Sequence, residues 1–178
     1  MRTKLALLFV VALAALAGAQ TNSTPAPKSQ EIYLTSGRGF FDGTARVVVY
    51  YDHVVVTNAQ GRLACERLTI HLPPDGAPDS HPTNAVAETN LDVFCVDNKG
   101  RTNHLVADKG IYAYGVRNGV TNETFTFGPH ATNTTDEGWF TGEPLIWDVQ
   151  KTNFDFGSGV EMHFKVRSDN STSPFNMK

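Results

Sequence analysis

The segment CERLTI at Cys65–Ile70 occurs again, in altered form, as ADKGIY at Ala107–Tyr112 and as GEPLIW at Gly142–Trp147. Each copy begins with a small residue, continues with an acid and then a cation or proline, and leads into a short apolar run. The acids stand 42 and 35 residues apart, a spacing typical of one supersecondary unit stacked on copies of itself. Because the unit is a pair of short strands, the repeat predicts a stacked β-array. Such arrays offer long continuous surfaces, which suit binding better than catalysis in a compact pocket.

The chain after residue 31 also indicates strands throughout. Val, Thr, Phe and Tyr fill short runs, and Gly, Asn, Asp and Pro separate them. We expect strands at 31–36, 45–57, 62–72, 85–96, 101–115, 121–127, 131–141, 144–150 and 158–166. We expect turns at Asn58–Gly61, Asn98–Gly100 and Arg117–Gly119, and a longer loop at Pro73–Pro78. Outside the N-terminal segment no stretch shows a helical period over ten residues, so the sequence predicts an all-β fold.

Alternation of apolar and polar residues indicates which side chains face the core. In the strand expected at 62–72, Leu68 and Ile70 fall on one parity and polar residues on the other, as in a half-buried antiparallel strand. The run Val47–Val56 is apolar on both faces and cannot be assigned by period alone. Its polar pair, Asp52-His53, lies at the centre of the run, where a β-bulge can form.

The N-terminus has the pattern of a secretory signal peptide. Arg2 and Lys4 give a basic start, Leu5–Leu16 is an apolar run, and Ala17–Ala19 is a small-residue cleavage site. We therefore expect cleavage after Ala19 and an exported mature chain. The apolar run is shorter than the roughly 20 residues that a membrane-spanning helix needs.

The remaining residues divide into a short leader, one domain and a tail. Residues 20–30 are rich in Thr, Ser, Pro and Asn, as in a disordered leader. We assign a single domain to residues 31–167 and a polar tail to 168–178. Loss of Arg2 and Lys4 with the signal peptide takes the net charge from −3 to −5. No basic patch is present, which argues against a nucleic-acid partner.

Two cysteines in an exported chain raise the question of a disulfide. A disulfide requires Cα atoms within about 7 Å and side chains that face each other. Alternation points Cys95 inward and Cys65 outward. A bridge between them is therefore disfavoured but stays open.

The stretch Glu31–Thr57 resembles the opening of the OstA-like family, the LptA-type periplasmic lipopolysaccharide-transport proteins. The matching elements are Ile32–Ser36, the pair Phe41-Asp42, Tyr50–Val56, and two copies of the repeated unit, Ala107–Tyr112 and Gly142–Trp147. The likeness extends from about residue 31 to 166. It implies a twisted single-sheet β-jellyroll, folded over like a taco and built from repeated antiparallel strand pairs.

The resemblance also implies a function, a location and a set of site residues. It implies a periplasmic protein that moves lipopolysaccharide between the inner and outer membranes, with acyl chains held in an apolar groove. The partners implied are membrane components with similar β-folds and further copies of the chain, joined head to tail. The groove positions carried over are Ile32, Leu34, Val48, Tyr50, Val54, Val56, Leu68, Ile70, Val93, Tyr112 and Tyr114.

Catalysis is not indicated by the sequence. The six histidines show no metal-ligand spacing, and no nucleophile elbow, phosphate loop or zinc signature occurs. We therefore expect no enzyme activity, no metal and no cofactor. Two other readings stay open: an exported carbohydrate-binding jelly-roll module, which exposed aromatics on a flat outer face would favour, and a structural envelope protein without a ligand.

Overall fold

The computed structural model describes residues 31–59, 61–77, 81–96, 100–117, 119–148, 151 and 153–165. The expected signal peptide, leader and tail lie outside this range, as do residues 98–99 of the turn expected at Asn98–Gly100. Across the described residues, no helix is both long enough and apolar enough to span a membrane.

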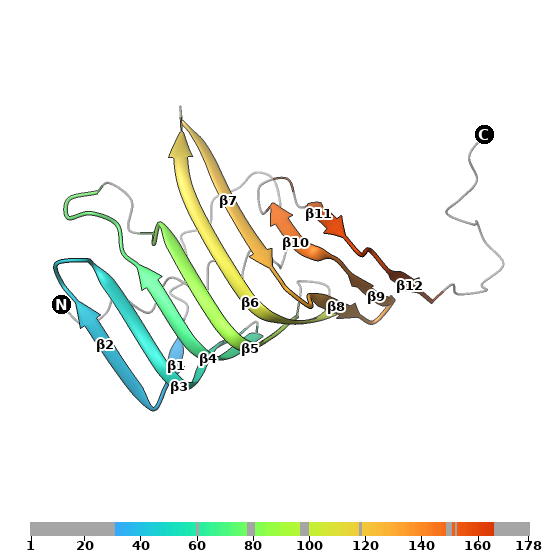
Figure 1. Cartoon of the computed structure of the whole chain (residues 1–178), viewed down its shortest axis with the longest axis horizontal. Coiled ribbons are helices and arrows are strands. Elements are labelled where there is room, and N and C mark those ends of the chain that lie inside the picture. The colour runs from blue at the N-terminus through green and yellow to red at the C-terminus, as the bar shows by residue number, and fades with distance from the viewer. Residues whose placement is uncertain are drawn as a thin grey trace.

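The described residues form one antiparallel sheet of twelve strands, arranged side by side from β2 to β12 (Figure 1). The strands are β1 (Tyr33–Thr35), β2 (Arg38–Asp42), β3 (Val47–Asn58), β4 (Gly61–His71), β5 (Asn84–Val96), β6 (Thr102–Arg117), β7 (Val120–Phe127), β8 (Thr132–Thr135), β9 (Gly138–Thr141), β10 (Glu143–Asp148), β11 (Asn153–Ser158) and β12 (Met162–Phe164). The all-β prediction is confirmed. The turns expected at Asn58–Gly61 and Arg117–Gly119 fall between β3 and β4 and between β6 and β7, although Gln60 and Asn118 lie outside the described residues.

The pairing pattern shows that the sheet has two arms. Residues 47–51 of β3 pair with β2, whereas residues 55–57 pair with β1. Residues 110–117 of β6 likewise pair with β7, and residues 103–106 pair with β8. Strands β3 to β6 therefore run through both arms. We call the arm containing β2, β7, β10 and β11 the first arm, and the arm containing β1, β8, β9 and β12 the second arm.

A row of backbone irregularities marks the line where the arms meet, which we call the corner. Pairing slips between Tyr51 and Val54 in β3, with corresponding slips in β4 and β5. The bulged pairs Asp52-His53 and Thr89-Asn90 have positive φ values between 55° and 66°. An extra residue bends a strand and increases its twist, so bulges in adjacent strands fold the sheet over. The bulge at Asp52-His53 confirms the position predicted from the sequence.

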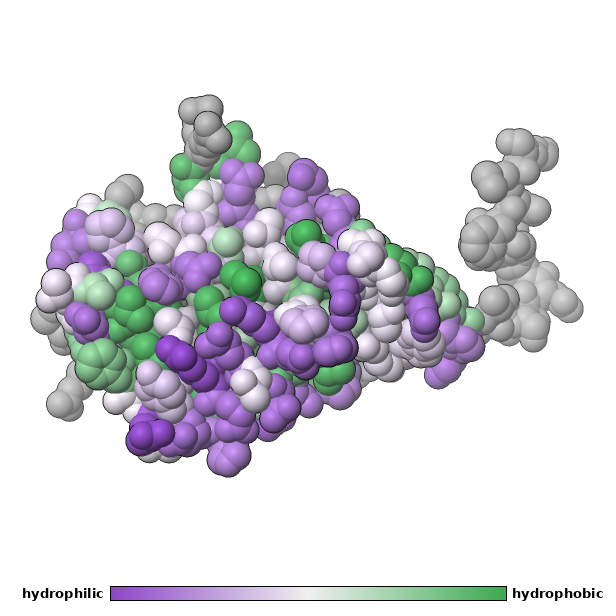
Figure 2. Space-filling model, viewed as in Figure 1, coloured by the Kyte–Doolittle hydropathy of each residue, from purple (hydrophilic) through white to green (hydrophobic). Residues whose placement is uncertain are grey.

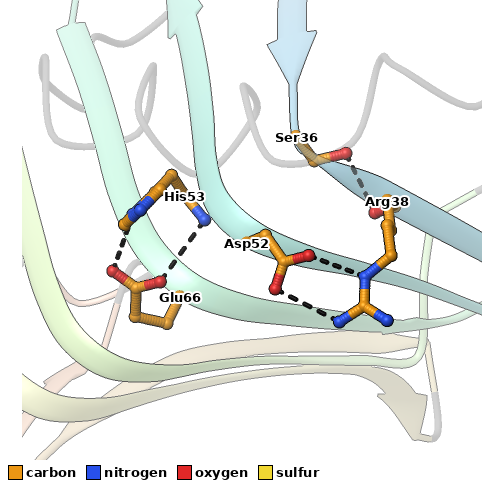
Figure 3. Close-up of polar contacts among 5 residues, drawn as sticks. All are labelled: Ser36, Arg38, Asp52, His53 and Glu66. Atoms are coloured by element: carbon orange, nitrogen blue, oxygen red, sulfur yellow. Dashed lines mark hydrogen bonds and ion pairs between the residues drawn. The ribbon is translucent and has the colours of Figure 1, made fainter.

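The acids of the repeated unit lie at this corner and bind groups that the bulges turn outward. Glu66 accepts from the backbone N–H of His53 at 3.4 Å, and its other oxygen lies 3.0 Å from His53 Nδ1 (Figure 3). Beside them, Arg38 Nε donates to Asp52 at 2.6 Å. The repeat seen in the sequence is therefore a repeat of corner positions.

The hydrophobic core lies between the inner faces of the two arms. Its most deeply buried large side chains include Val54, Leu68, Leu91 and Leu145, each no more than 2% exposed. Fully burying a side chain of this kind contributes about 1.5–3 kcal/mol. The outer face carries charged pairs instead, such as Lys109 with Glu88, which are 3.4 Å apart.

The predicted outward orientation of Cys65 is wrong, because it is buried at 3% exposure. Pairing between β4 and β5 shifts between Ala64 and Arg67, so the inward parity changes along β4. Leu63 and Cys65 face inward before this shift, and Leu68 and Ile70 face inward after it. Cys95 faces inward as predicted, and no disulfide joins it to Cys65. Cys95 lies opposite Gly61, four residues along β4 from Cys65.

Several strand boundaries also differ from the prediction. The strand expected at 131–141 is a hairpin of β8 and β9, whose residues pair from Thr132 with Thr141 to Thr135 with Gly138. Strand β2 and most of β11 were not predicted. Gly138 allows β12 to approach β9, since a Cβ there would lie 1.9 Å from the carbonyl oxygen of His163. This close approach ties the C-terminal strand to the sheet.

Candidate functional site

The inner face of the folded sheet is one continuous apolar surface, and it contains every groove residue expected from the sequence. Those buried in its cluster are Val48, Val54, Val56, Leu68, Ile70, Val93 and Tyr112. Ile32, Leu34, Tyr50 and Tyr114 are partly buried and pack against the same cluster. The fold thus brings together residues from β1, β3, β4, β5 and β6 and the segment before β1.

Many inner-face residues were absent from the expected set. They are Leu63, Cys65, Ala85, Ala87, Leu91, Cys95, Leu105, Ala107, Phe125, Phe127, Ala131, Leu145 and Trp147. Leu145 and Trp147 could have been predicted from the sequence, because they share one parity of an expected strand. Leu63 and Cys65 could not be found in this way, because the register shift between β4 and β5 changes the inward parity along β4.

The inner face changes in character along the sheet. The part formed by β3, β4 and β5 is mostly aliphatic, with Tyr50 as its aromatic member, whereas a row of aromatic rings begins at β6. The rings of Tyr112 and Phe125 are 5.0 Å apart, those of Phe125 and Trp147 are 5.4 Å apart, and those of Trp147 and Phe154 are 6.0 Å apart. Offset ring pairs at these distances add to the stability given by burial alone.

A narrow cavity lies between the arms at β5 to β8, with a volume of about 20 Å³. Its lining comes from both arms, including Val93, Leu105, Asn133 and Trp147. This space holds about one water molecule. An acyl chain can therefore enter here only if the arms separate.

Two polar side chains are buried on the otherwise apolar inner face. Glu123 in β7 is 6% exposed and Asn133 in β8 is 4% exposed. The Tyr112 hydroxyl donates to Glu123 Oε1 at 3.2 Å, and burial raises the pKa of the Glu123 carboxyl. Neither residue was expected from the sequence, although Glu123 shares its parity with Phe125 and Phe127.

The described side chains of the inner face are poorly suited to binding a metal ion or to acting as nucleophiles. Among the described residues, no group of three or more His, Cys, Asp or Glu could hold a metal ion. Burial raises the pKa of Cys65 to about 11, so its thiol stays protonated near neutral pH and is a poor nucleophile. The surface offers apolar contact and a few hydrogen bonds.

Both ends of the sheet are open within the described residues and carry exposed apolar side chains. At one end, β2 pairs with β3 alone and exposes Phe40 and Phe41. At the other end, β12 pairs with β9 alone and exposes Met162 and Phe164. Apolar and polar residues also mix over the face shown in Figure 2.

One solved structure with this arrangement is described as LptH, the LptA-homologous periplasmic component of the conserved lipopolysaccharide transport device from Pseudomonas aeruginosa. It matches 80% of this chain and 100% of its own chain, with a TM-score of 0.61 and 14% sequence identity. The fold is LptA-like. At this identity the match establishes the LptA-like fold alone. No protein-family model and no curated protein matches the sequence.

Proposed function

We propose that this protein is an exported, periplasmic carrier of lipopolysaccharide or a related lipid amphiphile, without enzyme activity. The observation that carries the proposal is the continuous apolar inner face between two arms that meet along one edge. Acyl chains make no hydrogen bonds and require such a lining, and each buried CH₂ contributes about 0.8 kcal/mol. The LptA-like fold supports the same conclusion.

The side chains of the outer face favour a lipid carrier over a carbohydrate-binding module. That face carries ion pairs such as Arg67 with Glu88 and Lys109 with Glu88 across neighbouring strands. Phe94 is exposed there but tilts against His104. A flat platform for sugar rings needs several aromatic faces turned to solvent, whereas here most rings pack inside.

We propose further that copies of the chain join head to tail at the open ends of the sheet. Glu161 O accepts from Thr141 N, and Lys165 N donates to Glu137 O, so these odd-numbered residues of the β12 segment bond toward β9. Because antiparallel bonding alternates along a strand, the backbone groups of Met162 and Phe164 point away from β9. They are therefore available to an added strand.

Photo-crosslinking at neighbouring positions tests the carrier. Crosslinkers at Leu34, Tyr50, Ile70 and Tyr112 should capture a lipid in cells, because these side chains belong to the inner cluster. Thr35, Thr69 and His71 are the controls, since adjacent residues of a strand point to opposite faces. Equal capture from both sets would contradict the proposed groove.

A further inference from the structure

Glu123 occupies an unusual place for a carboxylate. It lies on the inner face of β7, on the same parity as Phe125 and Phe127, and is 6% exposed. Inner-face positions of the neighbouring strand β10 carry Leu145 and Trp147. Burying a carboxylate among such residues destabilises a fold unless it is well partnered, so packing alone gives no reason for its presence.

The position of Glu123 along the strand places it away from the corner. Strand β7 begins at Val120 and ends at Phe127 next to the corner, so Glu123 lies on the far side of the aromatic row from the corner, toward the free rim of the first arm. Tyr114 lies directly opposite Glu123 in β6. A chain buried near the corner would have its polar end close to this rim.

Other polar groups gather around Glu123. The Tyr112 hydroxyl donates to it at 3.2 Å, and His81 stacks on Tyr114 with ring centres 4.8 Å apart and favours the charge of Glu123. A carboxylate can accept about four hydrogen bonds, and Tyr112 supplies one. The group can therefore accept from a ligand without giving up Tyr112.

On the inner face, the part of the first arm formed by β3 and β4 is apolar, unlike the surroundings of Glu123. Val48 and Ile70 are paired there, and both are buried in the apolar cluster. The second arm at β6 and β8 again carries polar inner-face groups, since Asn103 and Asn133 line the cavity between the arms. Polar inner-face groups thus occur on both arms at β6 to β8, next to the aromatic row.

We propose that Glu123 and Tyr112 form an anchor for the polar end of the bound amphiphile, one that takes a hydroxyl or ammonium group and excludes phosphate. This inference rests on the proposed carrier function and adds its ligand class at one position. A donor group gains a charge-assisted hydrogen bond from the carboxylate. A phosphate oxygen meets like charge in a water-poor site, where repulsion is poorly screened.

Three probes with the same twelve-carbon chain test the anchor: 1-monolauroylglycerol for hydroxyl groups, dodecylamine for ammonium and dodecyl phosphate for the anion. Binding is followed below the micelle concentration by fluorescence of Trp147, which packs between Phe125 and Phe154. A Trp139→Phe background leaves Trp147 as the only indole. The full mature chain should bind the glycerol and amine probes at least about tenfold more tightly than the phosphate.

Glu123→Gln should weaken dodecylamine binding about tenfold and tighten dodecyl phosphate binding, with the glycerol probe changed much less. Tyr112→Phe keeps the ring and should shift the ranking in the same direction. Glu137→Gln is the matched control in the exposed β8–β9 turn and should change nothing. An unchanged ranking in Glu123→Gln, with Trp147 still responding, overturns the anchor and leaves the carrier standing. If no probe alters Trp147 fluorescence, both are overturned.

Discussion

His130 Nδ1 lies 2.8 Å from a carboxylate oxygen of Asp108, the acid of the second repeated unit. The backbone N–H of His130 donates to Glu143, the acid of the third unit, also at 2.8 Å. His130 has a φ of 57°, close to the 56° of His53, which contacts the acid of the first unit. At two places along the corner, a residue with positive φ thus brings an imidazole and an N–H to acids of the repeat.

The contact with Asp108 should make the stability of the corner depend on pH. Hydrogen bonding to Asp108 is the main cause that raises the pKa of His130 above its ordinary value of 6.5. Stabilisation from this pair should be complete below about pH 6.5 and lost as the pH rises through the folded-state pKa. Imidazole titration by NMR should show a lower His130 pKa in Asp108→Asn, and Asp155→Asn should leave it unchanged. A His130 pKa that does not respond to Asp108→Asn would count against the contact.

Glu123 should also make stability fall as the pH rises, because burial raises the pKa of its carboxyl group. Its folded-state pKa lies above the ordinary value of 4.5, so stability should be greatest below that pH and should fall as the pH rises through the folded-state pKa. Tyr112 and His81 face the carboxyl and limit the loss. Glu123→Gln should remove this decline and stabilise the fold by about 1 kcal/mol at pH 8. Urea unfolding of both proteins at pH 4.5 and pH 8 measures this difference in stability. A variant whose stability falls with pH in parallel with the wild type would contradict the prediction.

Truncation of Leu68 should lower the free energy of unfolding more than truncation of most other residues. Leu68 is 0% exposed and lies between β3 and β5, opposite Tyr50 and Ala87. Leu68→Ala should lower the free energy of unfolding by about 2–5 kcal/mol, through lost burial and the cavity left behind. Val116→Ala, at 57% exposure, is the control and should stay within about 0.5 kcal/mol. Chemical denaturation of both variants gives the comparison.

Head-to-tail assembly should depend on the outward backbone groups of β12. A proline has no N–H, so Met162→Pro removes a donor that points away from β9 and should weaken oligomers. Truncation before Gly159 removes the whole strand and should weaken them as well. Light scattering over a wide concentration range measures both effects.

His163→Pro is the matched control for Met162→Pro. His163 pairs with Trp139 inside the chain, so this proline should disturb the β9–β12 pair within each copy, which thermal unfolding would detect. Met162→Pro should leave that unfolding largely unchanged. A mature protein that stays monomeric at high concentration, whatever its sequence at Met162, would rule out assembly through this edge.

Processing should remove the first nineteen residues. Ala17–Ala19 follows the apolar run as a small-residue site, so the mature N-terminus should be Gln20. Intact-mass measurement of protein purified from the cell envelope decides this. A chain that retains Met1 in that fraction would remove the basis for export through a cleaved signal peptide.

Some of the site could be predicted because strand alternation is local. Leu68 and Ile70 share a parity within one strand, and a two-residue period needs no knowledge of the rest of the fold. The repeated acids were also visible, and so was the polar pair Asp52-His53 within an apolar run. These features reveal inward faces and one bulge without any tertiary contact.

What the sequence by itself determined is the all-β class, the inward parity of several strands and the position of the bulge at Asp52-His53. Only the tertiary structure decided that the bulges of β3 and β5 align on either side of β4, which turns Cys65 inward and makes Glu66 a corner residue. It also decided that Glu123 faces Tyr112 inside the fold. The physical reason is that alternation fixes side-chain direction only relative to a neighbour in the same strand. A bulge resets that direction, and its effect depends on the register of the adjacent strands.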